Sequence, residues 1–186
     1  NVGKPEDGYS LHYQLAVGLA ALCWLGLGLF ALRRFLLECG SPDTPIAITL
    51  VLLTLGTGLV VQAVVHPAMS HVYGFAVIAL LLLSTRSLLI MPTPGSFIAC
   101  AALLGLAVLI RPVNMLVVLA LPMTAWNATV DSKAIKRLLF SPASLFSAIV
   151  FAAVVSVQGW LWYLQSGSFF VRAYPGEGFH WDRPEM

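Results

Sequence analysis

The side chain best suited to bind an anion in this sequence is Arg111. It follows a long apolar run, precedes Pro112 and lies three residues before Asn114. A guanidinium presents five N–H donors in a planar fork that matches a phosphate or a carboxylate. No Asp or Glu occurs between Asp43 and Asp131, so no acid close in sequence neutralises this charge. Two interpretations follow: Arg111 contacts an anionic substrate together with Asn114, or it anchors a helix at the membrane surface.

Two histidines, His66 and His71, flank a short Pro-Ala-Met-Ser segment. They are five residues apart with a proline between them, so they do not share a helix face. A zinc site needs a closer pair and a third ligand, and we predict no metal site here. The histidines either contact a substrate in an external pocket or lie at the interface without a substrate role. Ser70 is suited to cap a helix that begins beside it.

Near the C-terminus, two glycines bracket Glu177, and His180 and Trp181 follow shortly afterwards. Glycines allow tight turns, and aromatic side chains suit the membrane interface. One interpretation is an aromatic loop at the membrane surface. The other is a substrate loop in which Glu177 or His180 makes polar contacts and Trp181 provides a stacking surface.

Arg86 is the second fixed charge in the acid-free region. It falls near the inner end of an apolar run, where a long side chain can extend its charged head to water. We therefore expect Arg86 to be a structural residue that reaches the aqueous interface.

The composition of the 186-residue chain defines the elements that must position these residues. Hydrophobic residues make up 59% of it and charged residues 10%, with a net charge of +2. A soluble domain has roughly 45–50% apolar and about 25% charged residues, and so large an apolar surplus cannot be hidden in a small globule. The composition excludes a soluble enzyme domain, a nucleic-acid-binding protein and a disordered chain. It predicts an all-α polytopic transmembrane helical bundle.

A membrane-crossing helix needs about 20 mostly apolar residues. Residues 97–126 are too long for one such helix, and Arg111-Pro112 interrupts them, because a proline disfavours helical geometry at the residue before it. We therefore predict two short helices joined by a bend, and about five to six membrane helices in all. The predicted spans are residues 10–32, 45–65, 72–91, 97–110, 113–126 and 142–164.

Lysine and arginine collect in cytoplasmic loops. Arg33 and Arg34 therefore place the first loop inside, and Lys133, Lys136 and Arg137 also belong inside if residues 97–126 form a hairpin. Both ends of the chain, the segment 66–71 and Arg111 then lie outside. The alternative is a single kinked span, which would put the second basic cluster outside.

Several short motifs resemble the polytopic membrane glycosyltransferases that use polyisoprenyl-phosphate sugars, of the dolichyl-phosphate-mannose mannosyltransferase and aminoarabinose-transferase type (GT-C type). The motifs are Asp7-Gly8-Tyr9-Ser10 before a span, the segment 66–71 followed by Gly74-Phe75, the Gly-Leu-Ala run that leads to Arg111-Pro112, and the segment 176–181.

The resemblance implies a multi-pass protein of the bacterial inner membrane. It also implies that the active site lies on the outer face. The family's catalytic acid lies in the first external loop, and nothing here matches it. We therefore expect residues 1–186 to be a single transmembrane domain from a longer protein, with that acid upstream of Asn1 and no activity alone. Arg111 would stabilise the departing lipid phosphate, with Arg172 and Arg183 as alternatives.

The resemblance implies membrane lipid and a polyisoprenyl-phosphate sugar donor as partners, and no cofactor. The residues expected to bind substrate are Arg111, Asn114, His66, His71, Glu177, His180 and Trp181. Two other functions remain open from the sequence. A transporter or flippase segment would also use a broken helix and an intramembrane arginine, and a non-catalytic membrane subunit would need neither.

Overall fold

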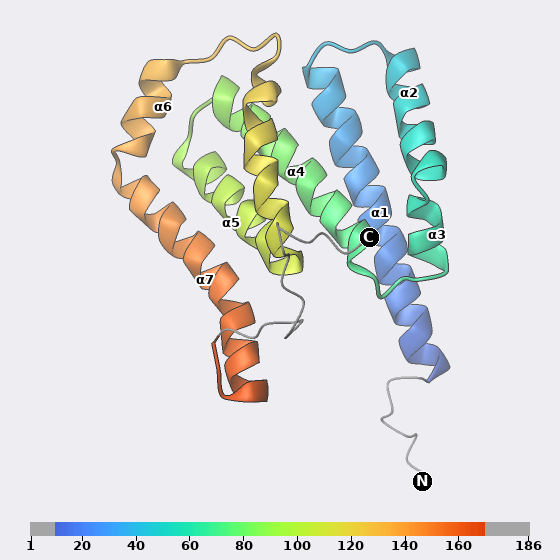
Figure 1. The fold of residues 1–186 in the computed structure, drawn as a ribbon. Helices are drawn as coiled ribbons and strands as arrows, with labels where there is room; N and C mark the ends of the chain where they lie inside the picture. Colours follow the sequence, from blue (N-terminus) through green and yellow to red (C-terminus); the bar gives the residue numbers. More distant parts are fainter. Residues whose placement is uncertain (1–9, 170–186) are drawn as a thin grey trace, which may run out of the picture.

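A computed structural model describes residues 10–169, and these residues form helices joined by short connections (Figure 1). The predicted all-α class is confirmed for this part of the chain, which contains no strand. The elements are α1 (Leu11–Glu38), α2 (Asp43–Val51), the π-helix η1 (Leu52–Gly56), α3 (Leu59–Val64), α4 (Ser70–Ile90), α5 (Pro94–Ile110), the 3₁₀ helix η2 (Pro112–Ala125), α6 (Ser132–Leu139) and α7 (Pro142–Ser166).

Three of these helices, α1, α4 and α7, are long and apolar enough to cross a membrane. The helices α5 and η2, and the segment of α2 with η1, are apolar but shorter. The predicted spans at both ends of the chain and at residues 72–91 therefore correspond to single long helices.

The segments α1, α2 to α3, α4, α5, η2 and α7 run alternately in opposite directions (Figure 1). Helix α4 packs between α1 and α5, α5 also packs against α7, and η2 lies against both α4 and α5. The segment from α2 to α3 forms one edge of the bundle, against α1. The start of α1, the start of α4, the start of η2 and the end of α7 gather at one end of the bundle, and α6 lies at the other.

The predicted break at Arg111-Pro112 is confirmed. Helix α5 ends at Ile110, Arg111 is extended with φ −151° and ψ 124°, and η2 begins at Pro112. The two helices lie against each other as a hairpin (Figure 1), so the alternative of one kinked helix is wrong. The proline keeps Arg111 out of helical geometry and supplies no N–H to continue the helix.

The span predicted over residues 45–65 is not one continuous helix. The π-helix η1 follows α2, and Gly58, with φ +72°, separates it from α3. The Thr54 hydroxyl donates to the carbonyl of Leu50 at 2.7 Å, and Thr57 donates to Leu53. Such threonine contacts supply partners for carbonyl groups where a helix is interrupted, and only glycine adopts this positive φ without strain.

Gly28 allows α1 and α4 to approach closely. A Cβ atom at this position would lie 2.7 Å from a ring carbon of Phe75 and 2.9 Å from the Cα of Ala76. Small residues permit this kind of backbone approach between membrane helices. The contact fixes the position of α4, and α4 carries both Arg86 and the residues that surround Arg111.

Candidate functional site

Arg111 lies where three helix ends meet. Its Nε donates a hydrogen bond to the Ser70 hydroxyl at 2.7 Å, and its terminal nitrogen lies 3.3 Å from Nε2 of His71. Ser70 and His71 are the first two residues of α4, whereas Arg111 separates α5 from η2. The extended backbone of Arg111 directs its side chain across to α4, so residues 40 positions apart in sequence come together.

The guanidinium of Arg111 has a histidine ring and no carboxylate as its neighbours within residues 10–169. A guanidinium has donors only, so a hydrogen bond in this contact has Arg111 as the donor and Nε2 of His71 as the acceptor. No carboxylate lies within ion-pair distance of Arg111 among residues 10–169. The guanidinium is exposed and keeps further N–H groups available for an anion.

Asn114 stabilises the bend beside this arginine. Its side-chain nitrogen donates to the carbonyl of Ala107 at 3.0 Å, and the backbone N–H of Arg111 donates to the same carbonyl at 3.1 Å. The amide therefore links the first turn of η2 to the last turn of α5. Asn114 lines the same pocket as Arg111, and its amide nitrogen serves the fold of the hairpin, while its contact with a substrate stays a prediction.

Ser70, His71, Arg111 and Asn114 line a small open pocket of about 140 Å³. Gly74, Phe75 and Ile78 of α4 complete its wall. A water molecule occupies about 30 Å³ in the liquid, so the pocket accepts a group the size of a few waters. This is room enough for a phosphate or a carboxylate group.

The other predicted site residues do not join this pocket in the described part of the chain. His66 is exposed in the connection between α3 and α4, where its carbonyl accepts a hydrogen bond from Met69 at 2.9 Å. Glu177, His180 and Trp181, and also Arg172 and Arg183, lie outside the described residues. Within residues 10–169, no three His, Cys, Asp or Glu side chains form a group that could hold a metal ion.

Arg86 differs from its expected position at the aqueous interface. Only 2% of the residue is exposed. One terminal nitrogen donates to the carbonyls of Thr124, at 2.8 Å, and Trp126, and the other donates to the carbonyl of Glu38 at 2.7 Å. The expectation that Arg86 extends to the interface is wrong, because its guanidinium finds acceptors inside the protein.

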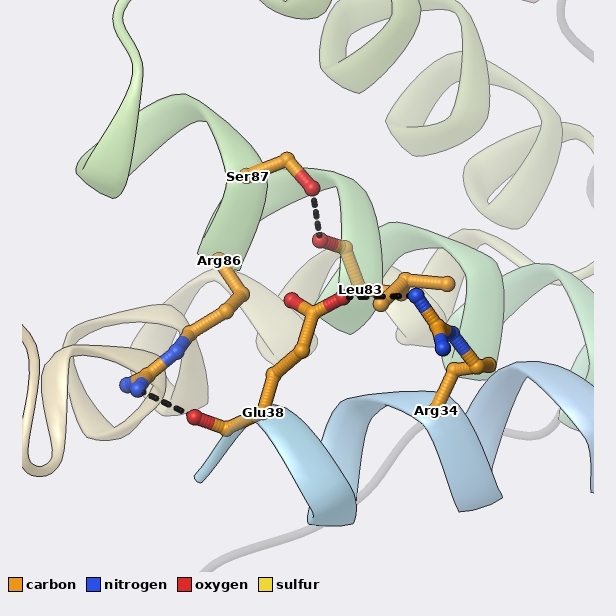
Figure 2. A network of polar contacts seen from close by, with 5 residues as sticks. All are labelled: Arg34, Glu38, Leu83, Arg86 and Ser87. Atoms are coloured by element: carbon orange, nitrogen blue, oxygen red, sulfur yellow. Dashed lines mark hydrogen bonds and ion pairs between the residues drawn. The ribbon is translucent and has the colours of Figure 1, made fainter. Parts of the chain in front are cut away.

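Arg86 thereby joins the C-terminal ends of two helices. Glu38 is the last residue of α1, and Thr124 and Trp126 lie at the end of η2. Helix C-termini carry unpaired carbonyls and partial negative charge, which a cation stabilises. Figure 2 shows Arg86 directed at the main-chain oxygen of Glu38, while the Glu38 carboxylate turns toward Arg34, 3.8 Å away.

The Cys39 thiol lies in the field of this arginine. Partial burial raises the pKa of Cys39, and the positive charge of Arg86 acts in the opposite direction. Burial has the larger effect, so the thiol stays protonated to a higher pH than a free cysteine.

Comparison of this chain with protein-family models, with curated proteins and with solved structures finds no match. The assignment of a function therefore depends on the geometry of the two arginines and on the arrangement of the helices.

Proposed function

We propose that the chain crosses a membrane six times, through α1, the segment from α2 to α3, α4, α5, η2 and α7. The alternating direction of these segments supports the proposal (Figure 1). The 14 residues of η2 extend about 28 Å at the ~2.0 Å rise of a 3₁₀ helix, close to the ~30 Å of a bilayer core. The 17 residues of α5 extend about 26 Å.

The charge distribution supports an orientation for this bundle. Arg33 and Arg34 on α1, and the basic residues of α6, lie at the end opposite the Arg111 pocket. Positively charged residues are retained on the cytoplasmic side. The Arg111 pocket then faces outward, at the level where lipid headgroups meet the hydrocarbon core.

The proposed function is binding of the phosphate of a polyisoprenyl-phosphate sugar, as part of an integral membrane glycosyltransferase. One observation carries it: Arg111 presents free donors in a pocket of phosphate size, with no carboxylate of the described chain to neutralise it. In such a transfer the bond between the sugar and the phosphate oxygen breaks, and a fixed guanidinium stabilises the departing lipid phosphate.

A complete transferase also needs a base for the acceptor hydroxyl. Among residues 10–169, no Asp or Glu lines the pocket, and His71 is already in contact with Arg111. We therefore assign the described chain to donor binding and leave the base to an acidic residue elsewhere in the full protein. The described residues alone should not turn over substrate.

Transport of a lipid-linked anion is the second candidate function. The broken segment from α2 to α3 favours it, because discontinuous helices often form ion and substrate sites in transporters. Glycosyl transfer and transport can be distinguished by their products. Movement of an intact lipid-linked sugar across vesicles, without transfer to an acceptor, would favour transport.

Binding of a short-chain polyisoprenyl phosphate to the full-length protein in detergent tests the proposal. Charge-assisted hydrogen bonds contribute about 1.5–3 kcal/mol, so Arg111→Ala should weaken binding by about one to two orders of magnitude. Arg111→Lys should recover part of the affinity, since an ammonium lacks the planar fork.

Arg33→Ala is the matched control, because it removes an exposed arginine from the opposite end of the bundle. Arg33→Ala should bind the polyisoprenyl phosphate with the affinity of the wild-type protein. Unchanged affinity in both Arg111 variants, with retained helical content, would eliminate the phosphate role.

A further inference from the structure

Helix α6 is a short amphipathic helix at the end of the bundle opposite the Arg111 pocket (Figure 1). Asp131 caps its start, since its carboxylate accepts the backbone N–H groups of Lys133 at 3.1 Å and Ala134 at 3.0 Å. At its end, the Ser141 hydroxyl donates to the carbonyl of Leu138 at 2.7 Å. Backbone groups at both ends of α6 are therefore hydrogen-bonded to side chains, which stabilises the helix over its eight residues.

The two faces of α6 differ in chemistry. At about 100° per residue, Lys133, Lys136 and Arg137 fall within an arc of about 100°, and all three are exposed. Ile135 and Leu138 lie on the opposite side, and Leu138 is buried. The apolar side therefore packs on the protein, next to the start of α7, and the basic side points away from it.

The cations of α6 have no acidic partners among the described residues. At the same end of the bundle, Arg33 lies 3.3 Å from Asp43 and Arg34 lies 3.8 Å from Glu38. No ion pair of this kind involves the three basic side chains of α6. They form the group of unpaired positive charges at this end of the described chain.

Large exposed apolar side chains lie at the end of α6, directly after it and at the end of η2. Phe140, directly after α6, is 92% exposed, Leu139 is 47% exposed, and Trp126, at the end of η2, is 72% exposed. A soluble polyanion would neutralise the cations and leave these side chains in water. A lipid surface accommodates both, because headgroup phosphates meet the cations while aromatic and leucine side chains enter the boundary with the acyl chains.

We propose that α6 lies in the plane of the cytoplasmic surface of the membrane. There it binds the phosphates of anionic phospholipids through Lys133, Lys136 and Arg137. Each Lys or Arg near an anionic membrane surface strengthens the association of the protein with anionic lipid by about fivefold. The three together select anionic over zwitterionic lipid. The proposal requires the membrane orientation given above and is independent of what Arg111 binds.

The experiment uses the full-length protein in bilayers of phosphatidylcholine that contain a small fraction of spin-labelled lipid. Electron paramagnetic resonance then gives the association of labelled phosphatidylglycerol relative to labelled phosphatidylcholine. The triple variant K133Q/K136Q/R137Q should reduce this ratio by about fivefold or more. The charge-preserving variant K133R/K136R/R137K should retain it, and R33Q/R34Q should leave it nearly unchanged because those arginines are already paired.

An equal lipid ratio in the triple variant and the unchanged protein would overturn the proposal. If the triple variant does not fold, the single variant K136Q and a salt series on the unchanged protein decide the question. Raising salt from 0.05 to 0.5 M should lower the ratio, because screening weakens exposed charge pairs. Loss of selectivity on addition of millimolar inorganic phosphate at constant ionic strength would assign α6 to a soluble anion and also overturn the proposal.

Discussion

Arg86 and Arg111 are two guanidinium groups that differ in what they contact. Arg86 is buried and donates to three main-chain carbonyls. Arg111 is exposed, and within residues 10–169 its side chain has polar contacts with Ser70 and His71. A buried cation whose two terminal nitrogens are bound to main-chain carbonyls stabilises structure, although the buried Nε of Arg86 has no partner among the described residues. An exposed fork with free donors is available to a ligand. The two roles follow from the acceptors that each side chain meets.

Arg86→Ala should lower the free energy of unfolding by about 2–4 kcal/mol, since it leaves buried carbonyls at the ends of α1 and η2 without donors. Arg86→Lys should recover part of the loss, because an ammonium reaches fewer of these carbonyls at once. Unfolding of the detergent-solubilised protein by sodium dodecyl sulfate measures the difference. Arg33→Ala removes an exposed ion pair and should change stability by less than about 1 kcal/mol. Equal effects from Arg86→Ala and Arg33→Ala would contradict the structural role.

The pH dependence of Cys39 alkylation provides a second test at this scale. Burial raises the pKa of the Cys39 thiol, so less reactive thiolate is present at pH 8 than in a free cysteine. Its alkylation by iodoacetamide should therefore be slower at pH 8, and should rise with pH through a midpoint above the ordinary thiol value. The protein carries Cys23→Ser and Cys100→Ser so that Cys39 is the thiol that reacts, and N-acetylcysteine amide in solution is the reference. A lower midpoint for Cys39 than for this reference would show that the Arg86 charge dominates.

At the scale of elements, the close contact between α1 and α4 depends on a glycine. The buried residues of α1 are Ala21, Leu25, Gly28 and Ala31, which form one stripe along the helix. The opposing part of α4 includes Phe75 and Ala76. Because α4 supplies Ser70, His71 and Arg86, a change in this contact affects both ends of the bundle.

Gly28→Ala should destabilise the protein by about 1–3 kcal/mol, since the new methyl group would lie 2.9 Å from the backbone of Ala76 and one helix must shift. Gly26→Ala is the matched control on the same helix, because nothing lies within 4 Å of a Cβ there. That control should be neutral or slightly stabilising. Detergent unfolding of both variants measures the contrast, and similar stabilities would refute the close approach.

At the scale of the whole molecule, local signals in the sequence predict the helices well and the interruption near Gly58 poorly. The composition defines the all-α class, and Pro112 identifies a break because its ring excludes helical geometry at Arg111. The interruption after α2 has a weaker signal, the run Thr54-Leu-Gly-Thr-Gly58, in which glycine permits a break without requiring one.

The candidate site, too, could be predicted from the sequence only in part. The proximity of Arg111 and Asn114 follows from their spacing, and the predicted topology places the segment 66–71 on the same side as Arg111. The individual contacts of Arg111 with Ser70 and His71 do not follow from the sequence. The contacts of Arg86 with Glu38, Thr124 and Trp126 join residues 38 or more positions apart through main-chain atoms. Main-chain carbonyls occur at every residue, so no side-chain pattern in the sequence identifies these partners.

The orientation of the whole bundle leads to the last prediction. The described start of α1 and the described end of α7 lie at the same end of the molecule, and α6 lies at the other (Figure 1). In a variant without native cysteines, Ser10→Cys and Ser166→Cys should react with an impermeant maleimide from the outer face. Ser132→Cys should react only after the membrane is permeabilised, because the basic residues beside it hold α6 on the cytoplasmic side. All three positions are at least partly exposed, so differences in labelling report the side of the membrane rather than burial. Equal labelling of Ser10→Cys and Ser132→Cys in sealed vesicles would refute both the six crossings and the inner position of α6.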